Sequence, residues 1–206
     1  MRPHLLPPNV TRSDPVLKSM FEARKRVFVD LLKWDVPVLG KRYEIDQFDT
    51  PDATYLILAA ARGKHRASAR LLRTDGAHIL GELFPRLCKG QIPSGATTRE
   101  ITRFCIDPEL SRAERREARN QLVTALVEHA ICTGITDYTA VASVGWFRQI
   151  AAFGWECQAL GPQRNVGGEL LVALHISVDE ETPAKLAANG IYCPSAFRLA
   201  GAGGLQ

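Results

Sequence analysis

Three carboxylates lie close together in the segment Glu44-Ile-Asp46-Gln-Phe-Asp49, which spans six residues. The segment follows a predicted helix that carries Arg24 on an apolar face and ends near Trp34. A guanidinium on such a face needs a carboxylate or an anionic ligand, because an unpaired buried charge is strongly destabilising. Acids beside an aromatic residue and a partly buried arginine suit a small zwitterionic ligand that also carries a cation.

Arg24 precedes Phe28 by four residues, so both side chains project from one face of the helix. Two interpretations of this arginine stay open: a structural ion pair with Asp46 or Asp49, and a binding site for a ligand anion. Both aspartates can equally well cap their own loop. Arg70 supplies a further cation for the same acids and favours a functional site.

A second charged cluster, Arg99-Glu100-Ile-Thr-Arg103-Phe104, lies about fifty residues further along the chain in a strand-like run. Glu100 and Arg103 are three positions apart, so in a regular strand they point to opposite faces of the sheet. They converge only where the strand is bulged, and bulges are frequent next to active sites. The alternative is a pair of surface charges on an edge strand.

Phe28, Trp34 and Phe84 have two possible uses. They can be ordinary core aromatics, or they can enclose an adenine ring or a sulfonium. A cation over a ring face gains roughly 0.5–2 kcal/mol.

The composition is that of an ordinary globular protein, with 46% hydrophobic and 23% charged residues in a chain of 206. This length predicts a single domain covering residues 1–206, with a loose Gly/Ala tail after Leu199. No apolar run is long enough to span a membrane, and two prolines interrupt the start of the chain where a signal peptide would be apolar. We therefore expect a cytoplasmic protein.

The cysteines and histidines argue against a metal site. The five cysteines are scattered and never spaced as Cys-x-x-Cys, so reduced thiols are expected rather than disulfides or a zinc site. The five histidines form no ligand pair, and no bound metal is predicted. The net charge of +4 is compatible with an acidic partner or an anionic substrate.

Hydrophobic periodicity predicts an α/β fold with a mixed sheet and helices on both faces. Such a sheet can splay open between the two strands that flank the longest helix. That helix is expected to turn Leu122, Leu126, Ala130 and Ile131 inward. The expected helices are Asp14–Lys33, 111–133 and Gly145–Phe153, and the expected strands are Tyr55–Arg62 and His65–Thr74 (a hairpin), Thr97–Ile106, Tyr138–Val144 and Glu169–Val178.

The first half of the longest helix contains the run Arg112-Ala-Glu-Arg-Arg-Glu-Ala-Arg119. Acids and bases alternate in it at three- and four-residue spacing. Most such runs are solvated helix faces. The other interpretation is a docking patch for an acidic protein.

With these positions in place, the sequence resembles the acyl-homoserine-lactone synthases, the LuxI-type autoinducer synthases of bacterial quorum sensing. The resemblance runs from about Lys18 to Val178. Each motif alone is weak, but their order and spacing together are specific. The motifs are Arg24-x-x-x-Phe28, Trp34-Asp-Val, Glu44-x-Asp46-x-x-Asp49, Ala69-Arg70-Leu-Leu-x-Thr74, Phe84 and Glu100-x-x-Arg103-Phe104.

The resemblance implies a fold like that of the GNAT acyltransferases, a three-layer αβα sandwich with a splayed cleft between two central strands. It implies an enzyme that joins S-adenosylmethionine to an acyl chain delivered as a thioester on acyl carrier protein or coenzyme A. The products are the acyl-homoserine lactone, methylthioadenosine and the free carrier. S-adenosylmethionine is a consumed substrate, so no cofactor is implied, and neither nucleic acid nor membrane is a partner.

The resemblance also implies roles for the charged residues. Glu100 is the first candidate for the general base and Asp46 the second, while Arg24 or Arg103 holds the methionine carboxylate. The residues implied in catalysis are Glu100, Asp46 and Arg103, and those implied in binding S-adenosylmethionine are Arg24, Phe28, Trp34, Asp46, Asp49, Arg70, Phe84 and Arg103.

An acyl pocket is implied around Thr102, Phe104, Ser143 and Trp146. Ser143 stands where many family members that accept 3-oxo chains carry threonine, which favours an unsubstituted acyl group. The bulk of Trp146 favours a short or reshaped tunnel over a long straight chain.

Two rival functions remain at this point. A generic GNAT N-acyltransferase that uses acyl-coenzyme A usually has a glycine-containing loop whose amides bind the pyrophosphate. The corresponding run here, Pro108-Glu-Leu-Ser-Arg-Ala-Glu-Arg, contains no glycine. A nucleic-acid-binding module would use the arginine-rich helix, but it would leave Arg24, Asp46 and Glu100 without a role.

Overall fold

The computed structural model describes residues 2–6, 14–60 and 63–193. The tail expected after Leu199 lies outside this part of the chain. The described residues divide into two compact units. The first holds the chain up to Arg70 together with Arg103–Ala125, and the second holds Leu71–Thr102 and Leu126–Cys193. The single domain expected for residues 1–206 stays a prediction.

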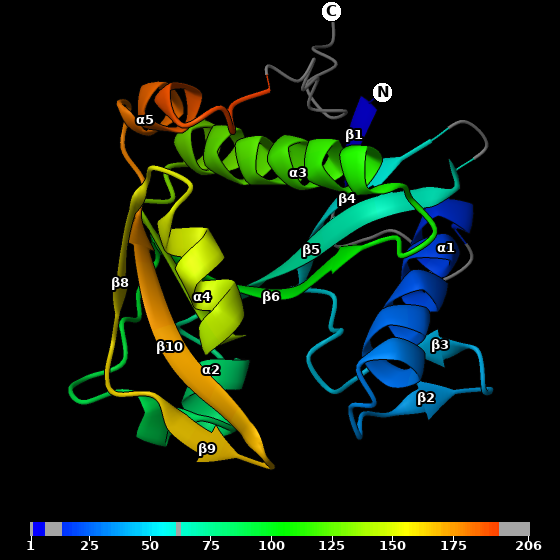
Figure 1. Ribbon diagram of the computed structural model, residues 1–206. Helices are drawn as coiled ribbons and strands as arrows, with labels where there is room; N and C mark the ends of the chain where they lie inside the picture. Colours follow the sequence, from blue (N-terminus) through cyan, green and yellow to red (C-terminus); the bar gives the residue numbers. More distant parts are fainter. Residues whose placement is uncertain (1, 7–13, 61–62, 194–206) are drawn as a thin grey trace, which may run out of the picture. The chain divides into compact units, whose positions relative to one another are not determined.

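The first unit contains antiparallel strands, a helix that changes type along its length and the first part of the long helix α3 (Arg112–Thr133) (Figure 1). The N-terminal strand β1 pairs antiparallel with β4, and β4 neighbours β5, the second strand of the predicted hairpin. Two short strands, β2 and β3, form a separate antiparallel pair that the sequence did not indicate. The elements are β1 (Arg2–Leu6), α1 (Pro15–Arg24), η1 (Lys25–Leu31), β2 (Val38–Leu39), β3 (Tyr43–Glu44), β4 (Thr54–Ala59), β5 (His65–Arg73) and the later part of β6 (Thr98–Ile106).

The helix predicted over Asp14–Lys33 is present but changes its geometry. The carboxylate of Asp14 accepts hydrogen bonds from the first amides of α1, including that of Val16 at 2.7 Å. From Lys25 the chain continues as a π-helix, in which the Leu32 N–H donates to the carbonyl of Val27, five residues earlier. Spacings of three and four residues do not distinguish the two helix types. Short π-helical segments are frequent at functional sites.

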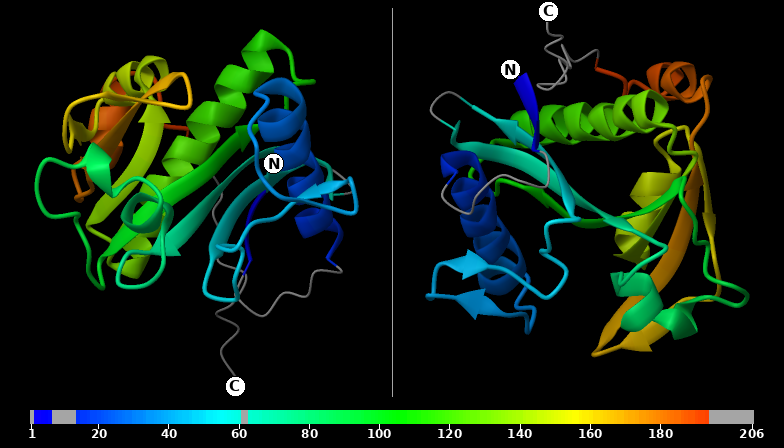
Figure 2. Two further views of the ribbon diagram at one scale, coloured as in Figure 1. Left: turned by 90° about the horizontal axis from the view of Figure 1, so that it is seen from below. Right: turned by 180° about the vertical axis from the view of Figure 1, so that it is seen from behind.

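The second unit contains the parallel part of the sheet (Figure 1, Figure 2). The first residues of β6 pair in parallel with β7, with Glu100 opposite Thr139. Strand β7 pairs antiparallel with β10, which also pairs antiparallel with β8 and β9. The elements are β7 (Asp137–Ser143), α4 (Val144–Ala151), β8 (Glu156–Ala159), β9 (Arg164–Val166), β10 (Glu169–Ser177), α2 (Ile79–Glu82), η3 (Pro85–Leu87) and α5 (Thr182–Ala188).

Helices cover both faces of the sheet in the second unit. On one face, the Tyr138 hydroxyl donates to the carbonyl of Leu126 in α3 (Arg112–Thr133) at 2.9 Å. On the other face, Val141 packs with Leu80 of α2 and with Ala173 of β10. Because Tyr138 and Val141 are an odd number of positions apart, they point to opposite faces of the strand.

The long helix α3 matches the prediction for three of its four inward residues. Leu122, Leu126 and Ala130 are buried. The prediction for Ile131 was wrong, since this side chain is 41% exposed. Consecutive helical residues are turned about 100° from one another, and buried Ala130 therefore directs its neighbour away from the core.

Parallel pairing of β6 with β7 and antiparallel pairing elsewhere confirm the predicted α/β fold with a mixed sheet. The splayed cleft stays a prediction. In the part of the chain that the structure describes, no helix combines the length and the apolar character that crossing a membrane requires.

Candidate active site

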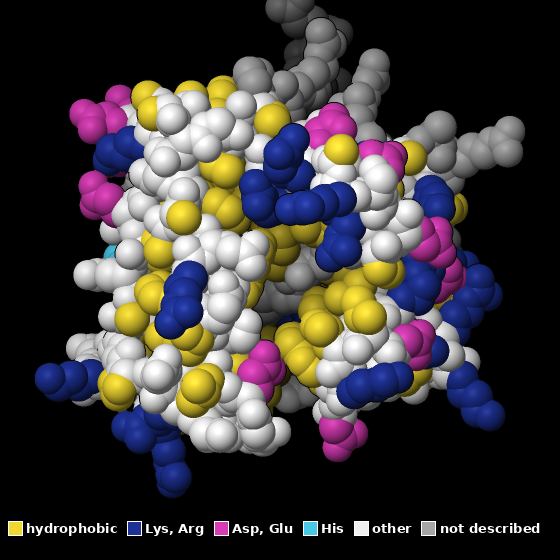
Figure 3. Space-filling view, viewed as in Figure 1, with side chains coloured by type: hydrophobic (Ala, Val, Ile, Leu, Met, Phe, Trp, Pro, Cys, Tyr) yellow, Lys and Arg dark blue, Asp and Glu magenta, His cyan; other side chains and the backbone are white. Residues whose placement is uncertain are grey.

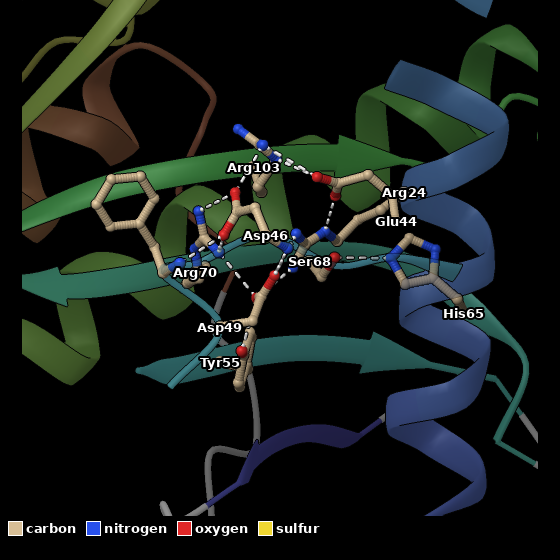
Figure 4. Close-up of polar contacts among 10 residues, drawn as sticks. Arg24, Glu44, Asp46, Asp49, Tyr55, His65, Ser68, Arg70 and Arg103 are labelled. Atoms are coloured by element: carbon tan, nitrogen blue, oxygen red, sulfur yellow. Dashed lines mark hydrogen bonds and ion pairs between the residues drawn. The ribbon is translucent and has the colours of Figure 1, made fainter. Parts of the chain in front are cut away.

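Three arginines and three carboxylates of the first unit form a closed ring of ion pairs, shown in Figure 4. Each arginine contacts two acids, and each acid contacts two arginines. The formal charges of the ring therefore cancel. Its members, in order around the ring, are Arg24, Glu44, Arg103, Asp46, Arg70 and Asp49.

Arg24, at the end of α1, is the most thoroughly engaged arginine of the ring. Its Nε donates to Glu44, and its two terminal nitrogens donate to the two oxygens of Asp49 at 2.8 and 2.9 Å. Its side chain is 1% exposed. Burial by itself lowers the pKa of Arg24, but Asp49 and Glu44 raise it above the usual value. Each of the three guanidinium nitrogens therefore already contacts one of the two acids.

Arg70, on β5, binds both aspartates of the loop. Its terminal nitrogens donate to the two oxygens of Asp46 at 2.6 and 3.1 Å, and one of them lies 2.8 Å from Asp49. The side chain is 1% exposed. Arg70 thus joins the loop of acids to the strand in a buried position.

Arg103, on β6, is the outermost arginine. It donates to Glu44 at 3.0 and 3.1 Å and to Asp46 at 2.7 Å. Its side chain is 10% exposed, compared with 1% for Arg24 and Arg70. The backbone φ of Arg103 is 51°, in the left-handed region that residues with a side chain rarely adopt. The strand is irregular at the place where the sequence predicts a bulge.

Asp49 is the most deeply coordinated of the aspartates. Burial by itself raises its pKa, yet the charges of Arg24 and Arg70 lower the pKa of Asp49 well below its usual value. It also accepts the backbone N–H of Asp46 at 2.8 Å and the hydroxyl of Tyr55 at 2.8 Å. These contacts hold the loop of acids in one conformation.

Two aromatic residues flank the ring beside Arg103. The rings of Phe28 and Trp34 stack with centroids 4.8 Å apart and planes at 16°. The Arg103 guanidinium lies 5.5 Å from the centroid of Phe28 and 5.9 Å from that of Trp34. The N–H of Trp34 donates to the carbonyl of Phe28 at 2.8 Å, so the end of the π-helix brings the two rings together. Trp34 remains 38% exposed.

Glu100 lies in the second unit and is fully buried. Its two carboxylate oxygens accept the backbone N–H groups of Ile79 and Leu80 at 2.7 and 2.8 Å, at the first turn of α2. A carboxylate at a helix start is stabilised by unpaired amides and by the helix dipole. Glu100 therefore caps the N-terminus of α2, which is a structural role. Its catalytic role stays a prediction.

The remaining predicted residues are distributed over both units. Phe84 packs against Leu80 and Leu87 in the second unit. The hydroxyl oxygen of Ser143 accepts the N–H of Trp146 at 3.4 Å and caps α4. Thr102 is buried, while Phe104 and Trp146 are half-buried. Their assignment to an acyl pocket stays a prediction.

Two residues of the ring region were not among the predicted site residues. Glu44 is fully buried and bridges Arg24 and Arg103. Its position as the first acid of the Glu44–Asp49 cluster could have identified it as a site residue from the sequence. Tyr55, whose hydroxyl binds Asp49, offered no signal in the sequence. Within the described ranges, no group of three or more His, Cys, Asp or Glu side chains is arranged to hold a metal ion.

The sequence is similar to a known protein family and to characterised members of it. The profile of the family described as autoinducer synthase matches residues 9–186. An acyl-homoserine-lactone synthase from Ralstonia nicotianae is 31% identical over 172 residues, covering 81% of this chain and 84% of the relative.

Solved structures agree with this match. The structure of MesI, a CoA-dependent acyl-homoserine lactone synthase, is 29% identical with a TM-score of 0.81, and the match covers 94% of this chain and 97% of MesI. A putative N-acetyltransferase from Lactobacillus plantarum, 14% identical, has a TM-score of 0.58 over 87% of this chain and all of the other. The second likeness shows a shared GNAT-type fold and nothing about substrates.

Proposed function

Because this chain belongs to the autoinducer synthase family, we propose that it is an acyl-homoserine-lactone synthase. It joins S-adenosylmethionine to an acyl thioester and releases an N-acyl-L-homoserine lactone, methylthioadenosine and the free thiol carrier. The ion-pair ring with its stacked aromatic pair is the observation that carries the proposal. It offers a cation, an anion and aromatic faces to a ligand that has a carboxylate, an ammonium and a sulfonium.

The amino-acid end of S-adenosylmethionine binds at Arg103 and Asp46 in this proposal. Arg103 is the most exposed arginine of the ring, and its contact with Asp46 lies at the least buried edge. The ligand carboxylate takes Asp46's place on the Arg103 guanidinium, and Asp46 then accepts the ligand ammonium. Arg24 and Arg70, whose charges are already neutralised, hold the loop in place.

The sulfonium and adenosyl groups bind against Phe28 and Trp34. A cation over an aromatic face is attracted by roughly 0.5–2 kcal/mol. The Arg103 guanidinium already lies over both rings, which supports the proposal that a cation binds on this side of the aromatic pair. Trp34 is 38% exposed, so part of its side chain is accessible to a ligand.

The first chemical step is acyl transfer to the α-amine, whose reference pKa is about 7.7–8.0. A general base removes one proton, and the amine nitrogen attacks the thioester carbonyl carbon. Glu100 is the first candidate for the base, acting through a water, and Asp46 is the second. Backbone amides at the irregular part of β6 stabilise the oxyanion. When the intermediate collapses, the carbon–sulfur bond breaks, the nitrogen loses its extra proton, and the leaving thiolate takes up a proton to give the free thiol carrier.

The second step closes the lactone. A carboxylate oxygen of the acylated intermediate attacks the γ-carbon, and the carbon–sulfur bond breaks to release methylthioadenosine. The sulfonium is a good leaving group, so holding the carboxylate near the γ-carbon supplies most of the acceleration. The residues that bind the amino-acid end thus also set up ring closure.

The acyl donor is a thioester of acyl carrier protein or coenzyme A, and the reaction takes place in the cytoplasm. MesI, the 29% identical relative, is CoA-dependent. Thr102, Phe104, Ser143 and Trp146 form the acyl pocket. The serine at position 143 favours a chain without a 3-oxo group.

Mass spectrometry of the reaction products tests the proposal. The purified protein is incubated with S-adenosylmethionine and a panel of acyl-coenzyme A and acyl-carrier-protein donors. We expect equal amounts of lactone and methylthioadenosine, and strongly reduced amounts of both with the Asp46→Asn variant. A product acylated on nitrogen without release of methylthioadenosine would favour the generic N-acyltransferase. No acylated product from any donor would overturn the proposal.

A further inference from the structure

Three polar side chains lie side by side across the sheet of the second unit. Glu100 on β6 is opposite Thr139 on β7, and Thr139 is opposite His175 on β10. Residues directly opposite one another in neighbouring strands project from the same face of a sheet. The three side chains therefore form one row across the strands, the polar row. All of its members belong to the second unit.

The contacts of α2 show which face of the sheet carries the polar row. The Leu80 N–H donates to the Glu100 carboxylate at 2.8 Å. The Leu80 side chain packs in one cluster with Val141 of β7 and Ala173 of β10. Each of these two strand residues is two positions from a member of the row, and residues two apart in a strand share a face. The polar row thus lies on the face that α2 covers.

Burial decreases along the polar row. Glu100 and Thr139 are fully buried, whereas the side chain of His175 is 15% exposed. The His175 Nε2 lies 2.7 Å from one carboxylate oxygen of Asp137, whose side chain is 30% exposed. The other oxygen of Asp137 accepts the hydroxyl of Thr136 at 2.6 Å. The row therefore begins at a buried carboxylate and ends at an imidazole–carboxylate pair that reaches solvent.

The hydroxyl of Thr139 is buried without a hydrogen bond. Among the residues that the structure describes, it has no hydrogen-bond partner. A buried hydroxyl without a partner costs free energy, and valine has the same shape without that cost. A hydroxyl can accept a proton from one neighbour and donate its own to another. Stability therefore gives no reason for a hydroxyl at this position, whereas proton transfer does.

The proposed reaction has to release one proton in each turnover. The ammonium of S-adenosylmethionine loses two protons as it becomes an amide nitrogen, and the leaving thiolate takes up one. Lactone closure neither binds nor releases a proton. In the proposed mechanism Glu100 takes up the remaining proton, and this residue is fully buried. Figure 3 shows hydrophobic side chains gathered at the surface over α4 and β10, and such groups transfer no protons.

We propose that the polar row conducts this proton from Glu100 through Thr139 to His175 and on to solvent. The inference rests on the proposed function, because that reaction supplies the proton. Thr139 and His175 act through Glu100 and touch no reacting atom, so they are positioning residues for its proton. Neighbouring strands lie about 4.8 Å apart, a spacing that one hydrogen bond or one bridging water spans.

The transfer balances at each atom. The Thr139 hydroxyl accepts the proton of the Glu100 carboxylic acid while it donates its own proton to the imidazole of His175. Because Nε2 lies beside Asp137, the ring takes up the proton at Nδ1. It then releases the proton on Nε2 through Asp137, the more exposed member of the pair. Proton exchange with solvent restores the starting tautomer, and Glu100 is again a carboxylate.

The Thr139→Val variant tests the buried part of the polar row, and Thr139→Ser, which keeps the hydroxyl, is the matched control. Glu100 begins the first turnover without a proton, so the first lactone per active site should form at the wild-type rate. Later turnovers of Thr139→Val should be at least about tenfold slower, because Glu100 then keeps its proton. Rapid-quench assays of lactone over time detect this burst. Thr139→Ser should behave as wild type, and Thr139→Val should melt no lower than wild type.

The His175→Ala variant tests the exposed end of the row. Its later turnovers should be slow as well, and added imidazole should restore them by accepting the proton in place of the missing ring. Sodium chloride at the same ionic strength should not restore them. Imidazole should not help Thr139→Val, because that variant interrupts the row at a fully buried position.

Three results would overturn the proton path. One is steady turnover of Thr139→Val at the wild-type rate. Another is a first turnover of Thr139→Val that is as slow as the later ones, which would mean a general defect of the site. The third is a His175→Ala variant that imidazole leaves unchanged. All three leave the proposed function intact, since lactone is still formed, whereas a wild-type protein that makes no lactone from any donor refutes the function and the path with it.

Discussion

The ion-pair ring of the first unit and Glu100 of the second unit bury carboxylates in two different ways. In the ring, Glu44, Asp46 and Asp49 are neutralised by guanidinium groups. Glu100 instead accepts two backbone amides at the start of α2. Side-chain charges can be counted in a sequence, whereas amides at a helix start exist only once the helix has formed. The difference explains which of the two sites could be anticipated.

The two arrangements also differ in what they leave for a substrate. The ring is self-sufficient, since every one of its charges already has two partners of opposite sign. A ligand can enter only by replacing one of those partners, and Arg103 is where replacement disturbs the least buried contact. At Glu100 the two described partners are backbone N–H groups at the start of α2.

The largest expected effect is on stability, from Arg24→Met. This change removes three hydrogen bonds and leaves Glu44 and Asp49 buried with one arginine each. We expect the free energy of unfolding to fall by about 3–5 kcal/mol, as measured by urea denaturation. The control is Arg42→Met, which removes an exposed ion pair with Glu22 and should cost less than about 1 kcal/mol. Similar losses in the two variants would mean that the ring is not a special structural element.

The Glu100→Gln variant separates the capping of α2 by Glu100 from its proposed role as the general base. Glutamine can accept one of the two amides but cannot remove a proton from the substrate. If Glu100 is the base, turnover should fall by about a hundredfold or more while the affinity for S-adenosylmethionine is kept. Calorimetry and product assays on the folded variant measure both. Normal turnover combined with lower stability would restrict Glu100 to capping α2.

His65 is a buried titratable group with neither an arginine partner nor a helix start beside it in the bond described for it, and it should have a smaller effect on stability that depends on pH. Its ring is fully buried and contacts the Ser68 hydroxyl at 2.9 Å (Figure 4). Burial, with a contribution from Arg26, lowers the pKa of His65 from 6.5 to about 3.

Between these two pH values the His65 ring therefore stays neutral in the folded protein, whereas the same ring takes up a proton in the unfolded chain. The contribution of this shift to the free energy of unfolding is complete above pH 6.5 and is lost as the pH falls towards 3. At pH 5 the loss should be about 2 kcal/mol, measured by denaturation at several pH values. The His65→Gln variant should lack this part of the slope, and an unchanged slope would contradict the assignment.

How much could be foreseen depended on the kind of interaction. The spacing of Glu44, Asp46 and Asp49 after Arg24 predicted an acid–arginine cluster, because buried charges of opposite sign need one another. The closure into a ring could not be foreseen, since it depends on the positive φ of Arg103 and on the loop that brings Asp46 to both Arg70 and Arg103.

The prediction of helices from hydrophobic periodicity was also incomplete. Periodicity located the helix before Trp34 but not its π-helical turn, which brings Phe28 and Trp34 into contact. Short elements such as α2 were missed because four residues carry too little periodicity to detect. With α2 unseen, the amide partners of Glu100 were invisible as well.

The most direct test of the central claim is a pair of calorimetric titrations on the Arg103→Ala variant. S-adenosylmethionine has a carboxylate and an ammonium, and methylthioadenosine has neither. If the edge of the ring at Arg103 binds the amino-acid end, the variant should bind S-adenosylmethionine at least about tenfold more weakly than wild type and methylthioadenosine equally well. Equal weakening of both ligands, or of neither, would contradict the account.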